Sequence, residues 1–134
     1  MDIKSFLHPK HEVSYITTSS SMREALDVLE SCHYTAIPIL DEQGIYCGTV
    51  SEGDLLWKMK ATPGLSFDTM HEVPLVTIKK KFKMESVRIG ADLDDMLKLA
   101  ADQNFVPVVE EGGIFLGIIR RKDIIEYYTR NITD

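Results

Sequence analysis

The sequence predicts an α+β fold made of two tandem copies of one β-α-β-β-α unit. Residues 38–56 align without a gap on residues 107–125, so that Asp54 pairs with Asp123. In both copies, short apolar segments bounded by turn residues alternate with segments whose apolar residues recur every three or four positions. The repeat is too long, and its copies too few, for a solenoid. The fold is therefore expected to be a tandem duplication.

Two repeats of this size are expected to pack on each other, because each alone would bury only a marginal core. We place the first repeat at residues 1–60, and the connector with the second repeat at residues 61–134. Pro63 and Gly64 break the helix that precedes the connector.

The elements of the first copy follow in order along the chain. The apolar 3-4 spacing from Met22 onward predicts an amphipathic helix, capped by one of the serines at positions 19–21. Strands are expected over residues 13–16, 34–40 and 45–50, with turn residues at 41–44 and a second helix from Ser51.

The second copy repeats this order. Its strands are expected over residues 86–89, 105–109 and 114–119, and its helices over residues 93–100 and 122–128.

Composition and motifs exclude several classes of function. A net charge of -6 argues against a general nucleic-acid binder, and no apolar run is long enough for a membrane span or signal peptide, so a cytoplasmic protein is expected. Cys32 and Cys47 lack a C-x-x-C spacing, and the four histidines do not form a metal-binding pair, so no metal site is predicted. No phosphate loop, nucleophile elbow or catalytic carboxylate pair is recognisable. The sequence therefore favours a protein that is not an enzyme.

One segment carries a family resemblance. The Tyr-Thr-Ala-Ile-Pro strand at residues 34–38, the return strand with Gly48 and the Ser-Glu-Gly-Asp-Leu sequence at residues 51–55 resemble the signature of the CBS domain. The second copy matches less completely, and together the copies resemble a CBS pair, or Bateman module, over nearly the whole chain. The chain is most similar to small stand-alone bacterial CBS proteins, some of which bind cyclic di-AMP.

The resemblance implies adenosine-nucleotide binding in two clefts, each of which uses strands of one repeat and the end of the other. For the first cleft it implies a base side at Ser14, Tyr15, Tyr34, Thr35, Ala36 and Pro38, and a ribose and phosphate side at Arg120, Arg121, Lys122 and Asp123. A carboxylate can accept hydrogen bonds from both ribose hydroxyls, and the small Ala36 lets a flat base approach the backbone. The three cations at the start of a helix favour phosphate.

A possible second site departs from this pattern. The resemblance implies base-side positions at Glu85, Gln103, Asn104 and Phe105, and ribose and phosphate positions at Ser51 and Asp54. Phe105 stands where the first site has Ala36, and its ring is expected to fill the base pocket. We expect one occupied site per chain, with the second closed or used weakly.

Structural interpretations compete with these functional ones. Asp54 and Asp123 could simply be acidic first-turn residues of helices, and Arg120, Arg121 and Lys122 could be solvated surface cations. The favoured function is a non-catalytic sensor of cyclic di-AMP or of AMP, ADP or ATP that signals to a partner protein. The resemblance also implies a homodimer. The alternative is a ligand-independent protein interaction module, and a cryptic nucleotide hydrolase is a weaker rival.

Overall fold

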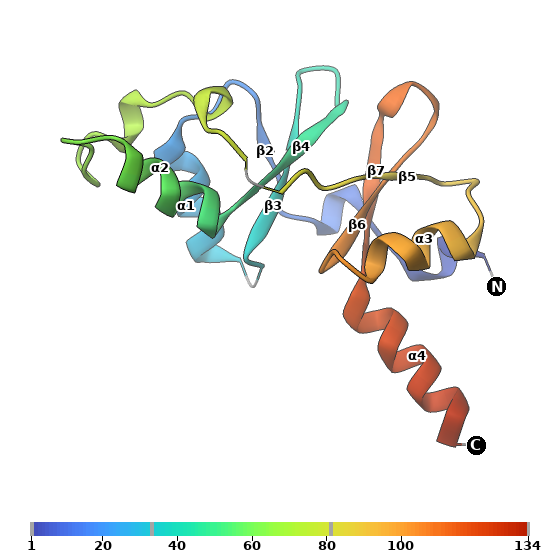
Figure 1. Ribbon diagram of the computed structural model, residues 1–134. Coiled ribbons are helices and arrows are strands. Elements are labelled where there is room, and N and C mark those ends of the chain that lie inside the picture. The colour runs from blue at the N-terminus through green and yellow to red at the C-terminus, as the bar shows by residue number, and fades with distance from the viewer. Residues whose placement is uncertain (1, 33, 81, 134) are drawn as a thin grey trace. The chain divides into compact units, whose positions relative to one another are not determined.

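Two small β-sheets with flanking helices make up the fold (Figure 1), and the α+β prediction is confirmed. The computed structural model describes residues 2–32, 34–80 and 82–133, with side chains up to residue 130. One sheet has the order β1-β7-β6-β5, from β1 (Leu7–Pro9), β5 (Val87–Arg88), β6 (Phe105–Val109) and β7 (Phe115–Arg120). The other has the order β2-β3-β4, from β2 (Ile16–Thr17), β3 (Ala36–Leu40) and β4 (Tyr46–Ser51). The α-helices are α1 (Met22–Ser31), α2 (Glu52–Ala61), α3 (Leu93–Ala100) and α4 (Arg121–Thr133).

The duplication extends to the register of the hairpins. In the β3–β4 pair, Ile39 lies opposite Gly48, and an irregularity follows Ile39. In the β6–β7 pair, Val108 lies opposite Gly117, and an irregularity follows Val108. Each hairpin also pairs in parallel with a two-residue strand that precedes a helix. The tandem repeat seen in the sequence is therefore a repeat of backbone geometry.

The chain forms two compact units that do not coincide with the sequence halves. The split unit comprises Met1–Val13 with Met84–Asp134, and the continuous unit comprises Ser14–Lys83. Hydrophobic burial explains the division: Ile3 and Phe6 join the core of the second repeat, whereas Met70, Leu75 and Ile78 join the core of the first. The segment that leads into each repeat thus packs with the core of the other repeat.

Strand β1 was not expected from the sequence. It pairs antiparallel with β7, placing His8 opposite Ile118 and Pro9 opposite Gly117. Gly117 has a φ of +155°, and a Cβ built on it would lie 2.0 Å from the carbonyl oxygen of His8. Glycine at this position is what allows the two backbones to come so close.

The sequence predicts the starts of helices more accurately than the starts of strands. Ser21 caps α1 in a capping box with Glu24, as the serine cluster predicted. The strand expected over residues 13–16 is shorter than predicted and shifted, because only Ile16 and Thr17 pair with the end of β3. Ser14 and Tyr15 therefore lie ahead of β2, and Tyr34 and Thr35 lie ahead of β3.

The connector contains two short 3-10 turns, Met70–Glu72 and Leu75–Thr77, whose buried residues belong to the continuous unit. Further 3-10 turns are Ile3–Phe6, Lys10–Glu12 and Glu111–Gly113. Within the described residues, no helix has both the length and the apolar character needed to cross a membrane.

Candidate functional site

Three charged side chains meet in the split unit where β7 ends and α4 begins. Arg120, the last residue of β7, donates from Nε and Nη2 to the two carboxylate oxygens of Asp123, each at 2.9 Å. His8 on β1 contacts Asp123 through Nε2, 2.5 Å from Oδ2. This Arg120–Asp123–His8 cluster is half-buried, with side-chain exposures of 33%, 22% and 31%.

The cluster stabilises the ionised form of Asp123. Burial alone would raise the pKa of Asp123, but hydrogen bonds and electrostatic attraction from Arg120 and His8 outweigh burial and hold it below the ordinary value of 3.8. Asp123 is therefore an anion at neutral pH, and a carboxylate has more acceptor positions than these three contacts use.

A cavity of about 430 Å³ lies beside the cluster. Its charged lining includes His8 and Asp123 together with Glu12, Glu126 and Arg130. His8 is the residue that sequence reasoning missed, because only the pairing of β1 with β7 brings it to Asp123. No local signal in the sequence announces a contact between residues that lie so far apart in the chain.

The other two cations of the predicted phosphate side do not join the cluster. Arg121 donates from Nη2 to Oδ1 of Asn104 at 2.6 Å, and its Nη1 lies 3.5 Å from the carbonyl oxygen of Ala100. Lys122 is exposed. Of the predicted cations, Arg120 is the one that contacts Asp123.

The equivalent residues of the continuous unit cap a helix. Ser51 is the N-cap of α2, its Oγ accepts from the amide of Asp54 at 3.2 Å, and Oδ2 of Asp54 accepts from the amide of Ser51 at 2.9 Å. Asp54 is only 5% exposed. This capping box gives Asp54 the structural role that the sequence left open as an alternative.

Two of the base-side residues predicted for the first site, Thr35 and Ala36, lie beside this capping box. Ala36, the first residue of β3, pairs with Ser51, and the carbonyl oxygen of Thr35 accepts from the amide of Glu52 at 2.9 Å. Pro38 is buried within β3. Tyr15 is 38% exposed. All the base-side residues predicted for the first site belong to the continuous unit, whereas the Arg120–Asp123–His8 cluster belongs to the split unit.

The base-side residues predicted for the second site are tightly bonded in the split unit. Phe105, the first residue of β6, is 3% exposed and pairs with Arg120. Gln103 is also 3% exposed, and its carboxamide bonds to the backbone of Glu85 and of Phe105. Asn104 holds Arg121 through both its side chain and its carbonyl oxygen.

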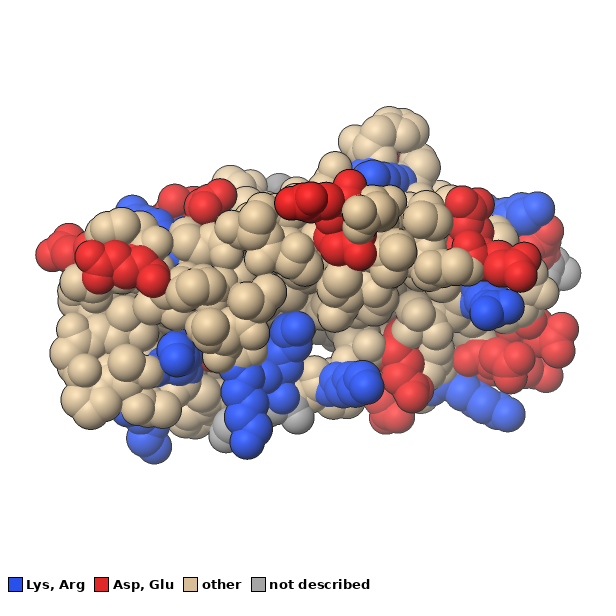
Figure 2. Space-filling view, turned by 90° about the horizontal axis from the view of Figure 1, so that it is seen from above, with Lys and Arg blue, Asp and Glu red and all other residues tan. Residues whose placement is uncertain are grey.

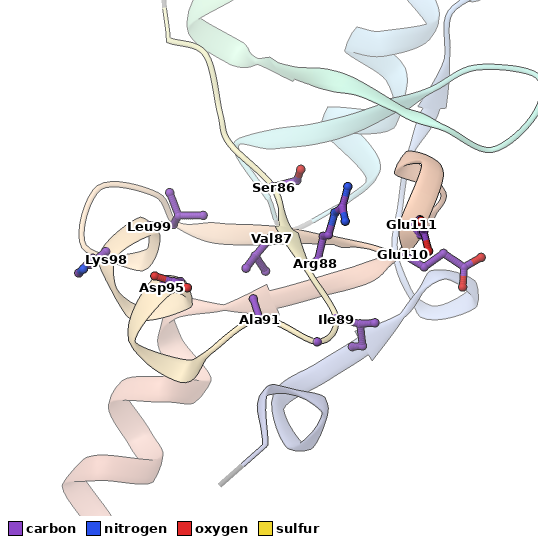
Figure 3. A pocket seen from close by; sticks show the side chains of 11 residues that line it. Ser86, Val87, Arg88, Ile89, Ala91, Asp95, Lys98, Leu99, Glu110 and Glu111 are labelled. Carbon is purple, nitrogen blue, oxygen red and sulfur yellow. The ribbon is translucent and has the colours of Figure 1, made fainter.

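A larger cavity of about 710 Å³ lies along β5 and α3 (Figure 3). Its charged side chains are of both signs, with Arg88 and Lys98 against Asp95, Glu110 and Glu111. None of the residues predicted to bind a ligand lines it. Its mixed charge does not favour a particular ligand.

The surface and the polar side chains bear on the other classes of function. On the face shown in Figure 2, Lys and Arg side chains are interspersed with Asp and Glu side chains, unlike the continuous positive surface of a general nucleic-acid binder. Within residues 2–32, 34–80 and 82–133, the His, Cys, Asp and Glu side chains form no group of three that could hold a metal ion.

The duplicated fold and its paired helix starts define a pair of CBS domains. The family model described as "CBS domain" matches residues 3–61 and again residues 71–130. The chain therefore belongs to the CBS domain family, as the resemblance indicated.

A curated relative is the CBS domain-containing protein CBSX2, chloroplastic, of Arabidopsis thaliana, 24% identical over 147 residues. The match covers 92% of this chain but 61% of CBSX2, so the chain spans about three fifths of that protein's length.

Solved structures share the fold over almost the whole chain. A CBS domain protein from Streptococcus pneumoniae TIGR4 has a TM-score of 0.85 and 25% identity, covering 98% of this chain and 89% of its own. CbpB in complex with c-di-AMP has a TM-score of 0.86 and 22% identity, covering 100% and 88%. The Listeria monocytogenes CbpB protein in complex with c-di-AMP has a TM-score of 0.82 and 21% identity, covering 97% and 96%.

Proposed function

We propose that this protein is a non-catalytic regulatory module that binds an adenosine nucleotide, cyclic di-AMP or AMP, ADP or ATP, and signals to a partner protein. CBS domain proteins are generally regulatory modules. The likeness in fold to CbpB complexes with c-di-AMP supports a nucleotide as the ligand. The observation that carries the proposal is the Arg120–Asp123–His8 cluster, a half-buried carboxylate between a guanidinium and an imidazole beside a cavity. Arg120 and Asp123 stand at positions that the family resemblance assigns to ribose and phosphate.

The cluster has complementary chemistry for a nucleotide. The guanidinium of Arg120 is a planar fork that suits phosphate oxygens, and the carboxylate of Asp123 accepts from hydroxyl groups. In the structure the two groups bond to each other, each contact at 2.9 Å. A ligand with both a phosphate and a ribose would pair the charge of Arg120 with phosphate and give the carboxylate of Asp123 hydrogen bonds from hydroxyl groups.

The same pair distinguishes the candidate ligands. AMP, ADP and ATP present two adjacent ribose hydroxyls to a carboxylate, whereas the phosphodiester links of cyclic di-AMP leave one hydroxyl on each ribose. Asp123 therefore favours a mononucleotide, and Arg120 favours whichever ligand places a phosphate beside it. The two classes remain joint candidates, and affinity measurements separate them.

Calorimetric titration of nucleotide-free protein with cyclic di-AMP, AMP and ATP tests the proposal. If Arg120 donates charged hydrogen bonds to phosphate, replacing it by alanine should weaken the binding free energy of the nucleotide by about 1.5 to 3 kcal/mol. This is a loss of about tenfold to a hundredfold in affinity. Lys122→Ala is the matched control, because Lys122 is an exposed cation of the same helix start and should have a smaller effect. Equal losses in the two variants would contradict the role of Arg120, and turnover of any nucleotide would contradict a non-catalytic function.

A ligand-independent interaction module is the second candidate, favoured by exposed apolar side chains. Leu56 on α2 is 61% exposed, and its repeat equivalent Ile125 on α4 is 57% exposed. Such side chains at matched positions also support a homodimer through these helices. The molar mass from light scattering, compared between the double variant Leu56→Asp with Ile125→Asp and the parent protein, tests the dimer. A lack of calorimetric binding to all three nucleotides would favour this second candidate.

A further inference from the structure

The buried carboxamide of Gln103 occupies backbone hydrogen-bonding groups of Glu85 and Phe105, two positions that the family resemblance assigns to the base side of the second site. Its Oε1 accepts from the amide of Glu85 at 2.9 Å, and its Nε2 donates to the carbonyl oxygen of Glu85 at 3.0 Å and to that of Phe105 at 3.2 Å. The side chain is 3% exposed, so these contacts satisfy a polar group that burial has removed from water. Gln103 thereby ties the chain just before β5 to the start of β6.

The pattern of these bonds matches the edge of an adenine. A carboxamide presents an acceptor and an adjacent donor, and adenine presents the same pair from a ring nitrogen and its exocyclic amino group. The amide and carbonyl of Glu85 form the complementary pair, one donor and one acceptor from a single residue. Gln103 therefore makes with Glu85 the two-point contact that an adenine edge would make.

The other unit lacks this device at the equivalent position. The repeat alignment pairs Gln103 with Tyr34 and Phe105 with Ala36. A phenol has no carboxamide edge, and alanine has no ring, so the continuous unit differs from the split unit at these two positions. In the split unit, Phe105 adds a ring and Gln103 satisfies backbone groups at positions that the resemblance assigns to a base.

We infer that Gln103 is an intramolecular mimic of an adenine base, which closes the base-binding part of the second CBS repeat. The inference rests on the proposed nucleotide function and adds to it a reason for one base site per chain. Phe105 alone would fill the pocket by bulk, whereas Gln103 also saturates the backbone groups that would read the base. A base entering the split unit must first break two hydrogen bonds to Glu85.

Nuclear magnetic resonance of nitrogen-15-labelled protein titrated with AMP tests this inference, with the amide of Glu85 as the reporter. In Gln103→Ala, the Glu85 signal should shift and saturate with an apparent affinity at least about tenfold higher than in the parent protein. If Gln103→Ala does not fold, the double variant Gln103→Tyr with Phe105→Ala carries the same test, because it introduces the side chains of the other unit.

The two possible failures have different signatures. A folded variant whose Glu85 amide does not respond to AMP overturns the inference, whatever happens in the continuous unit. A parent protein in which the amides of Ser14 and Thr35 do not respond to any nucleotide contradicts the proposed function instead. A saturable Glu85 response in the variant alone supports Gln103 as the occupant.

Discussion

Replacing Gly117 by alanine should detach β1 from β7 and disturb the Arg120–Asp123–His8 cluster. The new Cβ would lie 2.0 Å from the carbonyl oxygen of His8 and 3.0 Å from Cα of Pro9, both backbone atoms that no rotamer change can move. Gly48, at the equivalent place in β4, provides the matched control. A Cβ there would lie 3.0 Å from Nζ of Lys80, the flexible end of a side chain.

The size of the effect follows from what β1 holds in place. Ile3 and Phe6, which precede β1, are 1% and 8% exposed, and a buried side chain of this kind contributes about 1.5 to 3 kcal/mol. If the segment moves but keeps part of its packing, Gly117→Ala should lower the free energy of unfolding by about 2 to 5 kcal/mol. Gly48→Ala meets only the strain of a φ of +138° and should lower it by about 1 to 2 kcal/mol.

Urea denaturation followed by circular dichroism measures both losses, and the imidazole signals of His8 report the contact with Asp123. Gly117→Ala should move these signals toward those of Asp123→Asn, whereas Gly48→Ala should leave them in place. Equal losses of stability in the two glycine variants, or unchanged His8 signals in Gly117→Ala, would refute the reasoning.

Three further predictions concern titratable side chains. Asp54→Ala should lower the free energy of unfolding by about 1 to 2 kcal/mol through loss of the α2 cap, with Glu52→Ala as an exposed control from the same turn, and nucleotide affinity should not change. Because the pKa of Asp123 is held below 3.8, its contribution to stability is present above pH 3.8 and is lost as the pH falls through its lowered pKa. In Asp123→Asn, the urea midpoint should therefore fall less steeply as the solution is acidified. Burial, opposed by the hydrogen bond with Thr49, raises the pKa of Tyr46 from 10.0 to about 12, so stability should fall as the pH rises through this range, and Tyr46→Phe should remove that fall.

Local and repeated patterns made the fold predictable. The serine cluster before Met22 gave the start of α1, and the second copy of the hairpin gave β6 with its observed bounds. The short parallel strands were placed less well, because β2 and β5 are defined by two partners each on a neighbouring strand rather than by their own sequence. Strand β1 escaped prediction for the same reason, and Pro9 within it argued against a strand.

The contacts of the candidate site likewise differ in the sequence separation of their partners. Arg120 and Asp123 were predicted as ligand-binding residues, but the contact between them, three residues apart at a helix start, was not predicted. The contacts of His8 with Asp123 and of Gln103 with Glu85 join distant segments, separated by 115 and 18 residues. No periodicity records such pairs, and they emerge only when strands pair and helices pack.

Departures from the repeat symmetry are the most informative positions in this chain. At the start of α2, the capping box of Ser51 and Asp54 is sufficient to stabilise the helix, because it satisfies backbone amides that have no partner within the helix. At the start of α4 the acid directs both oxygens to the side chains of Arg120 and His8 instead. This ion pair joins the end of β7 to the start of α4 and, through His8, to β1, so it also has a structural role in the split unit. The proposed nucleotide would give the departure from the capping box a second role, because a guanidinium suits phosphate oxygens and a carboxylate accepts from ribose hydroxyls.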